Sequence, residues 1–160
     1  MQKFIVEGGV NLSGSITPSG NKNESLPVLA ACLLAKKPVI IHNVPEILDI
    51  SIMKDLLTGV GAVIKQFDKH SYQIDSGNIH SNNPDQKNAI RIRGSFLLAG
   101  PLLARKKSVV LPSPGGDRIG LRPVQTHLSA LEKLGTRINL SNNGIYEMET
   151  DGLKGAEIYL

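Results

Sequence analysis

The residues best suited to chemistry lie in one glycine-rich stretch, Leu111–Thr126, which reads LPSPGGDRIGLRPVQT. It contains a single acid, Asp117, followed by two arginines, Arg118 and Arg122. A carboxylic acid can donate a proton when its surroundings raise its pKa, and a guanidinium binds phosphate or carboxylate through paired hydrogen bonds. The stretch therefore predicts proton transfer beside a bound anion, and an ordinary surface loop is the alternative interpretation.

The residues after this loop predict a helix that begins beside it. Pro123 suits the first helical position, because the N–H that proline lacks would be unpaired there. Leucines at helical spacing predict a helix over Val124–Leu134, and Gly135 is expected to end it. The free N–H groups and the positive dipole end of a helix start both favour an anion, so the loop and the helix indicate the same kind of ligand.

A second candidate site, Lys22 and Asn23, lies near the N-terminus. The turn-forming residues Ser19–Asn21 precede it, and a helix is predicted over Glu24–Ala35 directly after it. Lys22 would then present a compact positive charge next to free helix N–H groups. The alternative is that Asn23 caps the helix and Lys22 is solvated.

Positive charge is concentrated in one part of the chain. Residues 87–122 hold eight lysines and arginines against one acid, a balance of +7 in a chain whose net charge is +4. Such a surplus favours an anionic partner. Nucleic acid fits poorly, because Phe96 is the one aromatic residue of this segment and no nucleic-acid-binding motif is present. A phosphorylated small molecule fits better.

Length and composition indicate one globular domain. A chain of 160 residues with 41% hydrophobic and 20% charged residues can bury a sizeable core. No apolar run reaches the length of a membrane span, and the N-terminus lacks the apolar block of a signal peptide, so a cytoplasmic location is expected. The single cysteine, Cys32, excludes an internal disulfide. No metal or cofactor is expected, because metal-ligand spacing is lacking among His42, His70, His80 and His127.

The chain contains an internal repeat of an α/β unit. Gly61 corresponds to Gly135 at an offset of 74 residues, and the apolar segments LAACLLAKK and LAGPLLARK correspond at an offset of 69. Repetition of this kind indicates stacked supersecondary units. The predicted units are about residues 22–90 and 91–152, with the start of a third at 155–160.

Hydrophobic periodicity predicts the other elements of each unit. One helix is expected from Asp49, its predicted cap, to Val60, and another over Gly94–Arg105 with a kink at Pro101. The expected strands are Phe4–Val6, Val10–Thr17, Pro38–His42, Ala62–Gln66, Ser71–Asp75, Ser108–Leu111, Arg137–Leu140 and Ile145–Glu149.

Four motifs, in order along the whole chain, resemble those of the enolpyruvyl transferases. The resemblance implies an α/β fold of repeated units, the inside-out barrel type, with helices packed inside and sheets outside. Members of the family have two such domains, so residues 1–21 would belong with a distal domain and residues 22–160 would form an incomplete first domain. The motifs are SGNKNESLP at Ser19–Pro27, NVP at Asn43–Pro45, IRGSFLLAGPLLA at Ile92–Ala104 and PGGDRIGLRPVQTHLSALEKLG at Pro114–Gly135.

The resemblance also implies a reaction. The pattern RPVxxHLxxLxxLG favours the branch that transfers the enolpyruvyl group of phosphoenolpyruvate to the 3′-hydroxyl of UDP-N-acetylglucosamine and releases phosphate, the first committed step of peptidoglycan precursor synthesis. The rivals are the shikimate-pathway enolpyruvyl transferase and a non-catalytic sugar-nucleotide-binding module. The chain alone is expected to be inactive, because a second domain is needed to complete the cleft. Neither nucleic acid nor a membrane is expected as a partner.

Matching positions imply the roles of individual residues. Asp117 would be the catalytic acid, at a position where many members carry a cysteine, and a closed, desolvated site would have to raise its pKa. Lys22 and Asn23 would bind phosphoenolpyruvate. Gln125 stands where most relatives carry an acid. The implied contacts to UDP-N-acetylglucosamine are Arg93, Arg122, Pro123, Val124, Gln125 and Thr126.

Overall fold

A computed structural model of the chain describes residues 3–116 and 123–159. The predicted site residues Asp117 and Arg122 lie outside these ranges. Two α/β units follow each other along the chain, and each contains a three-stranded antiparallel sheet.

The first unit has the strand order β1-β3-β2, and it contains the predicted hairpin of β2 and β3. In chain order its elements are α1 (Lys22–Ala31), the 3-10 turn η1 (Cys32–Leu34), β1 (Val39–Ile41), α2 (Leu48–Gly59), β2 (Val63–Asp68) and β3 (Ser71–Asp75).

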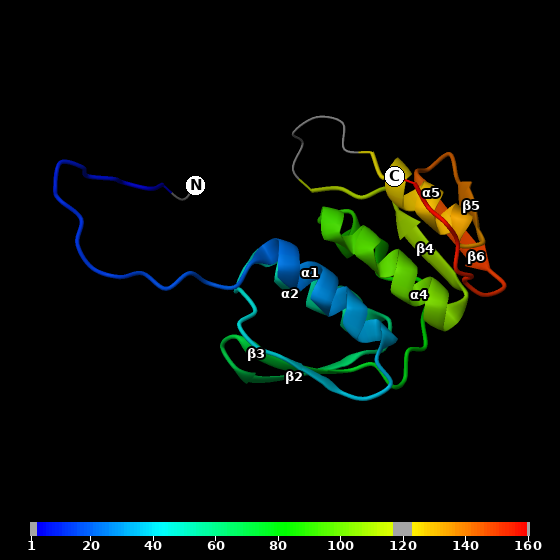
Figure 1. Cartoon of the computed structure of the whole chain (residues 1–160), viewed down its shortest axis with the longest axis horizontal. Coiled ribbons are helices and arrows are strands. Elements are labelled where there is room, and N and C mark those ends of the chain that lie inside the picture. The colour runs from blue at the N-terminus through cyan, green and yellow to red at the C-terminus, as the bar shows by residue number, and fades with distance from the viewer. Residues whose placement is uncertain (1–2, 117–122, 160) are drawn as a thin grey trace.

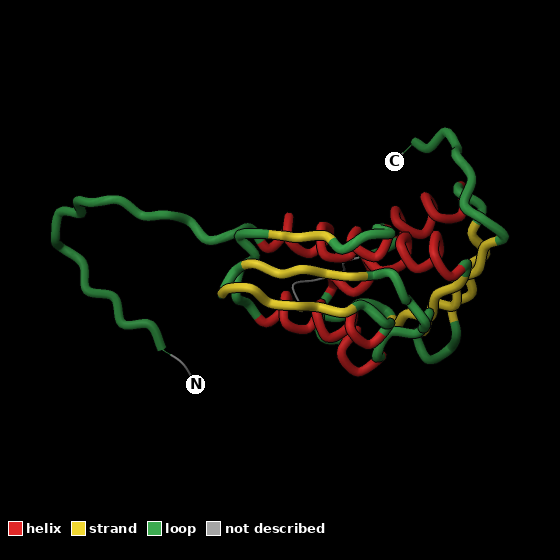
Figure 2. Tube along the Cα trace, turned by 90° about the horizontal axis from the view of Figure 1, so that it is seen from below, coloured by secondary structure: helices red, strands yellow, loops and turns green. Residues whose placement is uncertain are grey.

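The second unit repeats this order, with the sheet β4-β6-β5. Its elements are α3 (Gln86–Ala89), the 3-10 segment η2 (Arg93–Leu98), α4 (Ala99–Lys106), β4 (Ser108–Pro112), α5 (Gln125–Lys133), β5 (Thr136–Leu140) and β6 (Ile145–Thr150). The helical segments of the two units lie against each other, and the two sheets lie on either side of them (Figures 1 and 2). Helices are therefore inside and sheets outside, as predicted.

The predicted repeat is confirmed at residue level. Ile64 pairs with Ile74 in the first sheet and Ile138 with Met148 in the second, and corresponding residues are 74 positions apart. The glycines that follow α2 and α5, also 74 apart, both have a positive φ, 115° and 94°. Glycine adopts this conformation without a Cβ penalty, so it ends both helices in the same way.

Helix α2 places its predicted apolar face in the core. Ile52, Met53, Leu56 and Leu57 are each at most 2% exposed. Full burial of one such side chain stabilises the fold by about 1.5–3 kcal/mol. This face packs α2 against α1 and β2.

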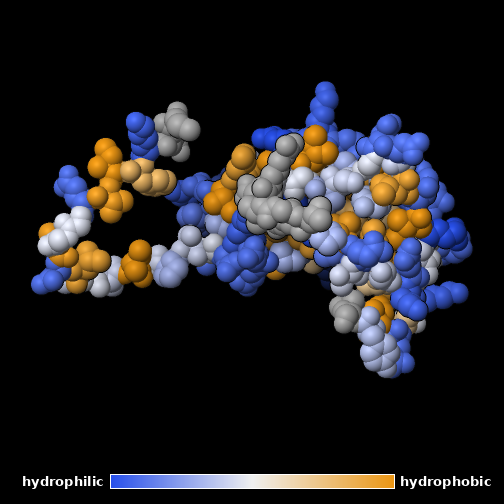
Figure 3. Space-filling view, turned by 90° about the horizontal axis from the view of Figure 1, so that it is seen from above, coloured by the Kyte–Doolittle hydropathy of each residue, from blue (hydrophilic) through white to orange (hydrophobic). Residues whose placement is uncertain are grey.

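Residues 3–21 contain no helix or strand, so the two expected N-terminal strands are not formed in this chain. They extend away from the body of the molecule as an arm whose apolar side chains are exposed, with Phe4 at 97% and Leu12 at 93% (Figure 3). A strand needs a neighbouring strand to take its backbone hydrogen bonds, and no other part of the described chain lies alongside the two expected strands (Figure 1). Residues 151–159, where a third unit was expected to start, also contain no helix or strand.

Helix α1 begins at Lys22, two residues earlier than predicted, because Asn21 is its N-cap. The Asn21 side chain accepts hydrogen bonds from the backbone N–H groups of Asn23 at 2.7 Å and Glu24 at 3.4 Å. The interpretation of Asn23 as the cap is therefore wrong, and Lys22 and Asn23 lie inside the first turn.

Three other helix starts also differ from the prediction. The N-cap of α2 is Ile47, so Asp49 lies in the first turn and does not cap the helix. The helix predicted to be kinked at Pro101 is divided into η2 and α4, with Pro101 in the first turn of α4, where its missing N–H has no intrahelical partner. The N-cap of α5 is Val124, so Pro123 precedes the helix. Across residues 3–116 and 123–159, no helix is both long and apolar enough to cross a bilayer.

Candidate anion-binding site

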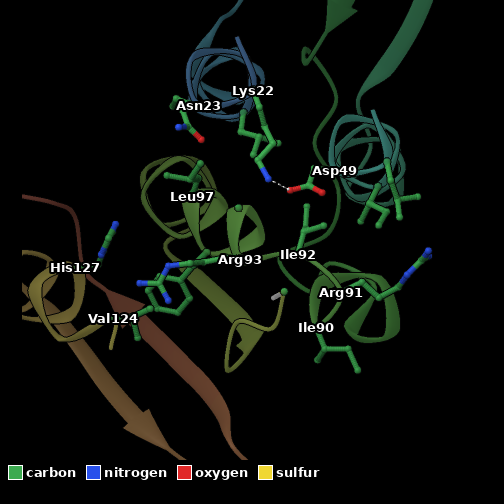
Figure 4. A pocket seen from close by; sticks show the side chains of 17 residues that line it. Lys22, Asn23, Asp49, Ile90, Arg91, Ile92, Arg93, Leu97, Val124 and His127 are labelled. Atoms are coloured by element: carbon green, nitrogen blue, oxygen red, sulfur yellow. Dashed lines mark hydrogen bonds and ion pairs between the residues drawn. The ribbon is translucent and has the colours of Figure 1, made fainter. Parts of the chain in front are cut away.

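The beginnings of four helical segments meet around a cavity of about 660 Å³. Each of α1, α2, η2 and α5 contributes residues from its first turn or its N-cap. The unpaired N–H groups and positive dipole ends of helix starts favour anionic ligands. The polar side chains that line the cavity are those of Lys22, Asn23, Asp49, Arg91, Arg93 and His127 (Figure 4).

The turn before α1 is packed against the NVP motif. Gly20 lies so close to Asn43 that a Cβ on the glycine would be 1.8 Å from the Asn43 carbonyl oxygen. Asn43 has a positive φ of 57°, and the next residue, Val44, donates its N–H to the carbonyl of His70 at 2.9 Å. This packing determines where α1 starts, and it therefore places Lys22 at the cavity.

Lys22 and Asn23 lie in the first turn of α1, and both line the cavity. The Lys22 ammonium nitrogen is 2.8 Å from Oδ2 of Asp49, at the start of α2 (Figure 4). The side chains of Lys22 and Asp49 are 46% and 31% exposed, so the ion pair remains in contact with solvent. The sequence suggested Asp49 only as a helix cap, because no local pattern connects two residues that are 27 positions apart.

Arg93 connects η2 to the start of α5. Its Nη2 donates a hydrogen bond to the carbonyl oxygen of Pro123 at 3.0 Å. Val124 is 6% exposed and lines the same cavity. The structure thus brings together three of the residues predicted to contact a nucleotide, Arg93, Pro123 and Val124. Two others, Gln125 and Thr126, are exposed and do not line the cavity.

The glycine pair of the predicted catalytic loop is packed against the cavity wall. A Cβ on Gly115 would lie 1.6 Å from the carbonyl oxygen of Ile90. Gly116, with φ 94°, lines the cavity, and a Cβ there would lie 3.3 Å from the backbone nitrogen of Arg93. Gly116 is the last described residue before the predicted acid, which lies outside the described ranges.

The cavity also contains polar residues that the sequence had not indicated. Arg91 lines it two positions before Arg93, and these residues flank the extended Ile92. His127, in the first turn of α5, makes an edge-to-face contact with Phe96, with 6.0 Å between the ring centroids. Two sequence signals could have indicated them. Arg91 and Arg93 are two positions apart, which places both side chains on one face of an extended segment, and His127 lies within one helical turn of the start of α5.

The described residues that line the cavity carry a net positive charge. Lys22, Arg91 and Arg93 are positive and Asp49 is negative, so three minus one leaves +2. Several cations beside helix starts suit a ligand with more than one negative charge. Within the described ranges, no group of three or more His, Cys, Asp or Glu residues could hold a metal ion.

Comparison with known proteins relates the chain to one family. Residues 6–160 match the family described as EPSP synthase (3-phosphoshikimate 1-carboxyvinyltransferase). Two relatives named UDP-N-acetylglucosamine 1-carboxyvinyltransferase come from Bradyrhizobium diazoefficiens and Desulfatibacillum aliphaticivorans. They are 45% and 43% identical over 158 and 160 residues, which is 99% and 100% of this chain but 36% and 38% of theirs. The chain therefore spans little more than a third of their length.

Solved structures share the fold. The enolpyruvyl transferase NikO from Streptomyces tendae has a TM-score of 0.77 at 24% identity, covering 91% of this chain and 32% of that chain. EPSP synthase from Acinetobacter baumannii has a TM-score of 0.66 at 20% identity, covering 89% of this chain and 33% of that chain. At these identities the likeness concerns the fold alone, and it confirms the predicted fold class.

Proposed function

The chain belongs to the EPSP synthase family of enolpyruvyl transferases, and on that premise we propose that it forms one wall of an active site for phosphoenolpyruvate and UDP-N-acetylglucosamine. The reaction would transfer the enolpyruvyl group to the 3′-hydroxyl of the sugar and release phosphate. The names of the relatives at 45% and 43% identity support this acceptor. The reaction would be the first committed step of peptidoglycan precursor synthesis, in the cytoplasm.

The observation that carries the proposal is the meeting of four helix starts and three cations at one cavity. Phosphoenolpyruvate carries a phosphate and a carboxylate, and a sugar nucleotide carries a diphosphate. Lys22 suits a compact phosphate as a point charge, whereas the planar guanidinium of Arg93 suits paired oxygen atoms. We assign Lys22 and Asn23 to phosphoenolpyruvate. The residues assigned to the sugar nucleotide are Arg93, Arg122, Pro123, Val124, Gln125 and Thr126.

The proposed chemistry needs an acid that delivers a proton to C3 of phosphoenolpyruvate while the sugar hydroxyl, losing its own proton, attacks C2. Phosphate then leaves from the tetrahedral intermediate, and loss of a proton from C3 restores the double bond. We assign the acid to Asp117, and the position of Gly116 at the cavity wall supports this assignment. Exclusion of water would keep the carboxyl group protonated near neutral pH, because desolvation disfavours its charged form.

This chain would supply one side of the site. It covers 36% and 38% of the two relatives, so we expect the opposite wall to come from the rest of a longer protein. The arm at residues 3–21, with its exposed apolar side chains, suits a strand that pairs with that part. The isolated chain is therefore expected to bind its ligands weakly and not to turn them over.

The test joins this chain to the portion of the Bradyrhizobium relative that it does not cover. After cooperative unfolding of the joined protein has been verified, phosphate release is measured with phosphoenolpyruvate and either UDP-N-acetylglucosamine or shikimate 3-phosphate. Release with the sugar nucleotide is expected. Release with shikimate 3-phosphate alone would identify the rival acceptor, and nucleotide binding without any release would identify a binding module.

A pair of lysine variants of the joined protein tests the assignment of the cavity. Lys22→Ala should raise the KM for phosphoenolpyruvate about tenfold or more, the loss expected for a charge-assisted hydrogen bond. Lys37→Ala, at an exposed position outside the cavity lining, is the matched control and should leave the KM unchanged.

A further inference from the structure

Asp49 is the one acid among the described residues that line the cavity. An acid in a cavity for anions lowers affinity by charge repulsion unless it has another role. An aspartate near a helix start often accepts hydrogen bonds from the free N–H groups, but α2 has no side-chain cap. The Asp49 carboxylate instead lies 2.8 Å from the ammonium nitrogen of Lys22, on a different helix (Figure 4).

Lys22 stands where its own helix disfavours a cation. It is the first residue of α1, next to the positive end of the helix dipole. Its side chain is 46% exposed, and a lysine side chain gains conformational entropy when it moves freely in solvent. The Asp49 carboxylate opposes both the unfavourable dipole and the free motion of the side chain. It supplies the opposite charge, and it holds the ammonium group at the cavity that both residues line.

We infer that Asp49 is a positioning residue for Lys22. An ammonium group has three N–H donors, so the ion pair uses one of them and leaves two for an anion in the cavity. The ligand class is an anion with a phosphate group, and Asp49 acts on it only through Lys22. The inference rests on the proposed function in one respect, the assignment of Lys22 as an anion contact.

The test measures the binding of inorganic phosphate to this 160-residue chain by NMR titration of the backbone amides of Lys22, Asn23 and Arg93. Asp49→Ala is expected to weaken phosphate binding about two- to fivefold, the range of a solvent-exposed ion pair. Charge repulsion alone predicts the opposite, tighter binding. Asp49→Glu keeps the carboxylate and should restore most of the affinity.

A matched control separates positioning from a change in net charge. Asp55→Ala removes an exposed acid from the same helix, α2, outside the cavity lining, and it should not weaken phosphate binding. The same titration is repeated in a Lys22→Ala background, where phosphate binding is followed at the Arg93 amide. In that background Asp49→Ala should cause no further loss of phosphate affinity. Thermal unfolding of every variant verifies that the fold is retained.

The outcomes distinguish this inference from the proposed function. Equal or tighter phosphate binding by Asp49→Ala, or an equal loss in the Lys22→Ala background, would overturn the positioning role alone. If phosphate leaves the Lys22 and Asn23 amides of the parent chain unaffected, the assignment of Lys22 is overturned and the inference with it. A joined protein that binds phosphate as expected but releases none from phosphoenolpyruvate would contradict the proposed catalysis alone.

Discussion

Gly115 and Ile90 are packed so closely that a Cβ on the glycine would lie 1.6 Å from the Ile90 carbonyl oxygen. This contact joins the glycine-rich loop that follows β4 to the turn between α3 and η2. A side-chain rotation cannot relieve a clash with a backbone oxygen, so any larger residue at position 115 must displace one of the two segments.

We predict that Gly115→Ala lowers the free energy of unfolding by about 1–3 kcal/mol, the usual cost of forcing extra atoms into a packed position. Gly59→Ala is the matched control, because Gly59 is helical and a Cβ there meets nothing within 4 Å. It should stabilise the chain by about 0.5–1 kcal/mol. Urea unfolding of both variants measures the difference, and similar stabilities would contradict the close packing.

A second prediction concerns the N-cap of α1. Asn21→Ala should lower the free energy of unfolding by about 1 kcal/mol, since its side chain accepts from two helix N–H groups. Asn23→Ala should cost markedly less, because the Asn23 side chain does not cap the helix. Thermal unfolding by circular dichroism compares the two. An equal or larger loss for Asn23→Ala would favour the capping role that the sequence had left open.

Arg105 of α4 links the second unit to the first. Its guanidinium donates to the carbonyl oxygens of Leu33 at 2.8 Å, Ala35 at 3.3 Å and Ser76 at 3.0 Å. We predict that Arg105→Ala destabilises the chain by about 1.5–3 kcal/mol. Arg105→Lys should recover only part of this, because an ammonium lacks the planar fork. Chemical denaturation measures both, with Lys106→Ala, a neighbour with one long 3.5 Å contact, as the control that should change little.

The features that the sequence predicted correctly are those whose pattern is complete within a few residues. The apolar face of α2 follows from helical spacing alone, and the hairpin of β2 and β3 follows from two short runs that mix apolar and polar residues and are joined by a turn. The repeat was visible because Gly61 and Gly135 meet the same backbone requirement in both units. The residues of the site, by contrast, came from resemblance to a family, because their spacing along the chain also fits an ordinary loop.

The features that the sequence could not predict depend on residues far apart or on a neighbour. The pair of Lys22 and Asp49 spans 27 positions, and the hydrogen bond from Arg93 to Pro123 spans 30. The choice of Asn21 as the cap depends on packing of the preceding turn against the NVP motif. The runs Phe4–Val6 and Val10–Thr17 have the apolar and β-branched residues of short strands, but the sequence does not supply the pairing partner that a strand requires.

Burial raises the pKa of the Cys32 thiol above its ordinary value of 9.0. Above pH 9 the thiol of the unfolded chain ionises while that of the folded chain keeps its proton, so its contribution to stability is full below pH 9 and is lost as the pH rises. The Cys32→Ser variant carries a hydroxyl group that does not ionise in this pH range. This hydroxyl keeps a donor for the Val28 carbonyl oxygen, which the Cys32 Sγ contacts at 3.3 Å. The stability of the parent relative to this variant, measured by urea unfolding, should therefore fall as the pH rises above 9, and a constant difference would contradict the buried thiol.

The last prediction concerns Asp117, which lies outside the described residues, and it is tested in the joined protein. Asp117→Asn should abolish phosphate release, because an amide has no comparably acidic proton, and it should leave nucleotide binding nearly unchanged. Asp117→Cys should retain activity, because a thiol can deliver the same proton. A plain loop acid predicts little change for either variant. Normal turnover of Asp117→Asn at saturating phosphoenolpyruvate would show that another group is the acid, whereas loss of nucleotide binding together with turnover would indicate a structural role for this carboxylate.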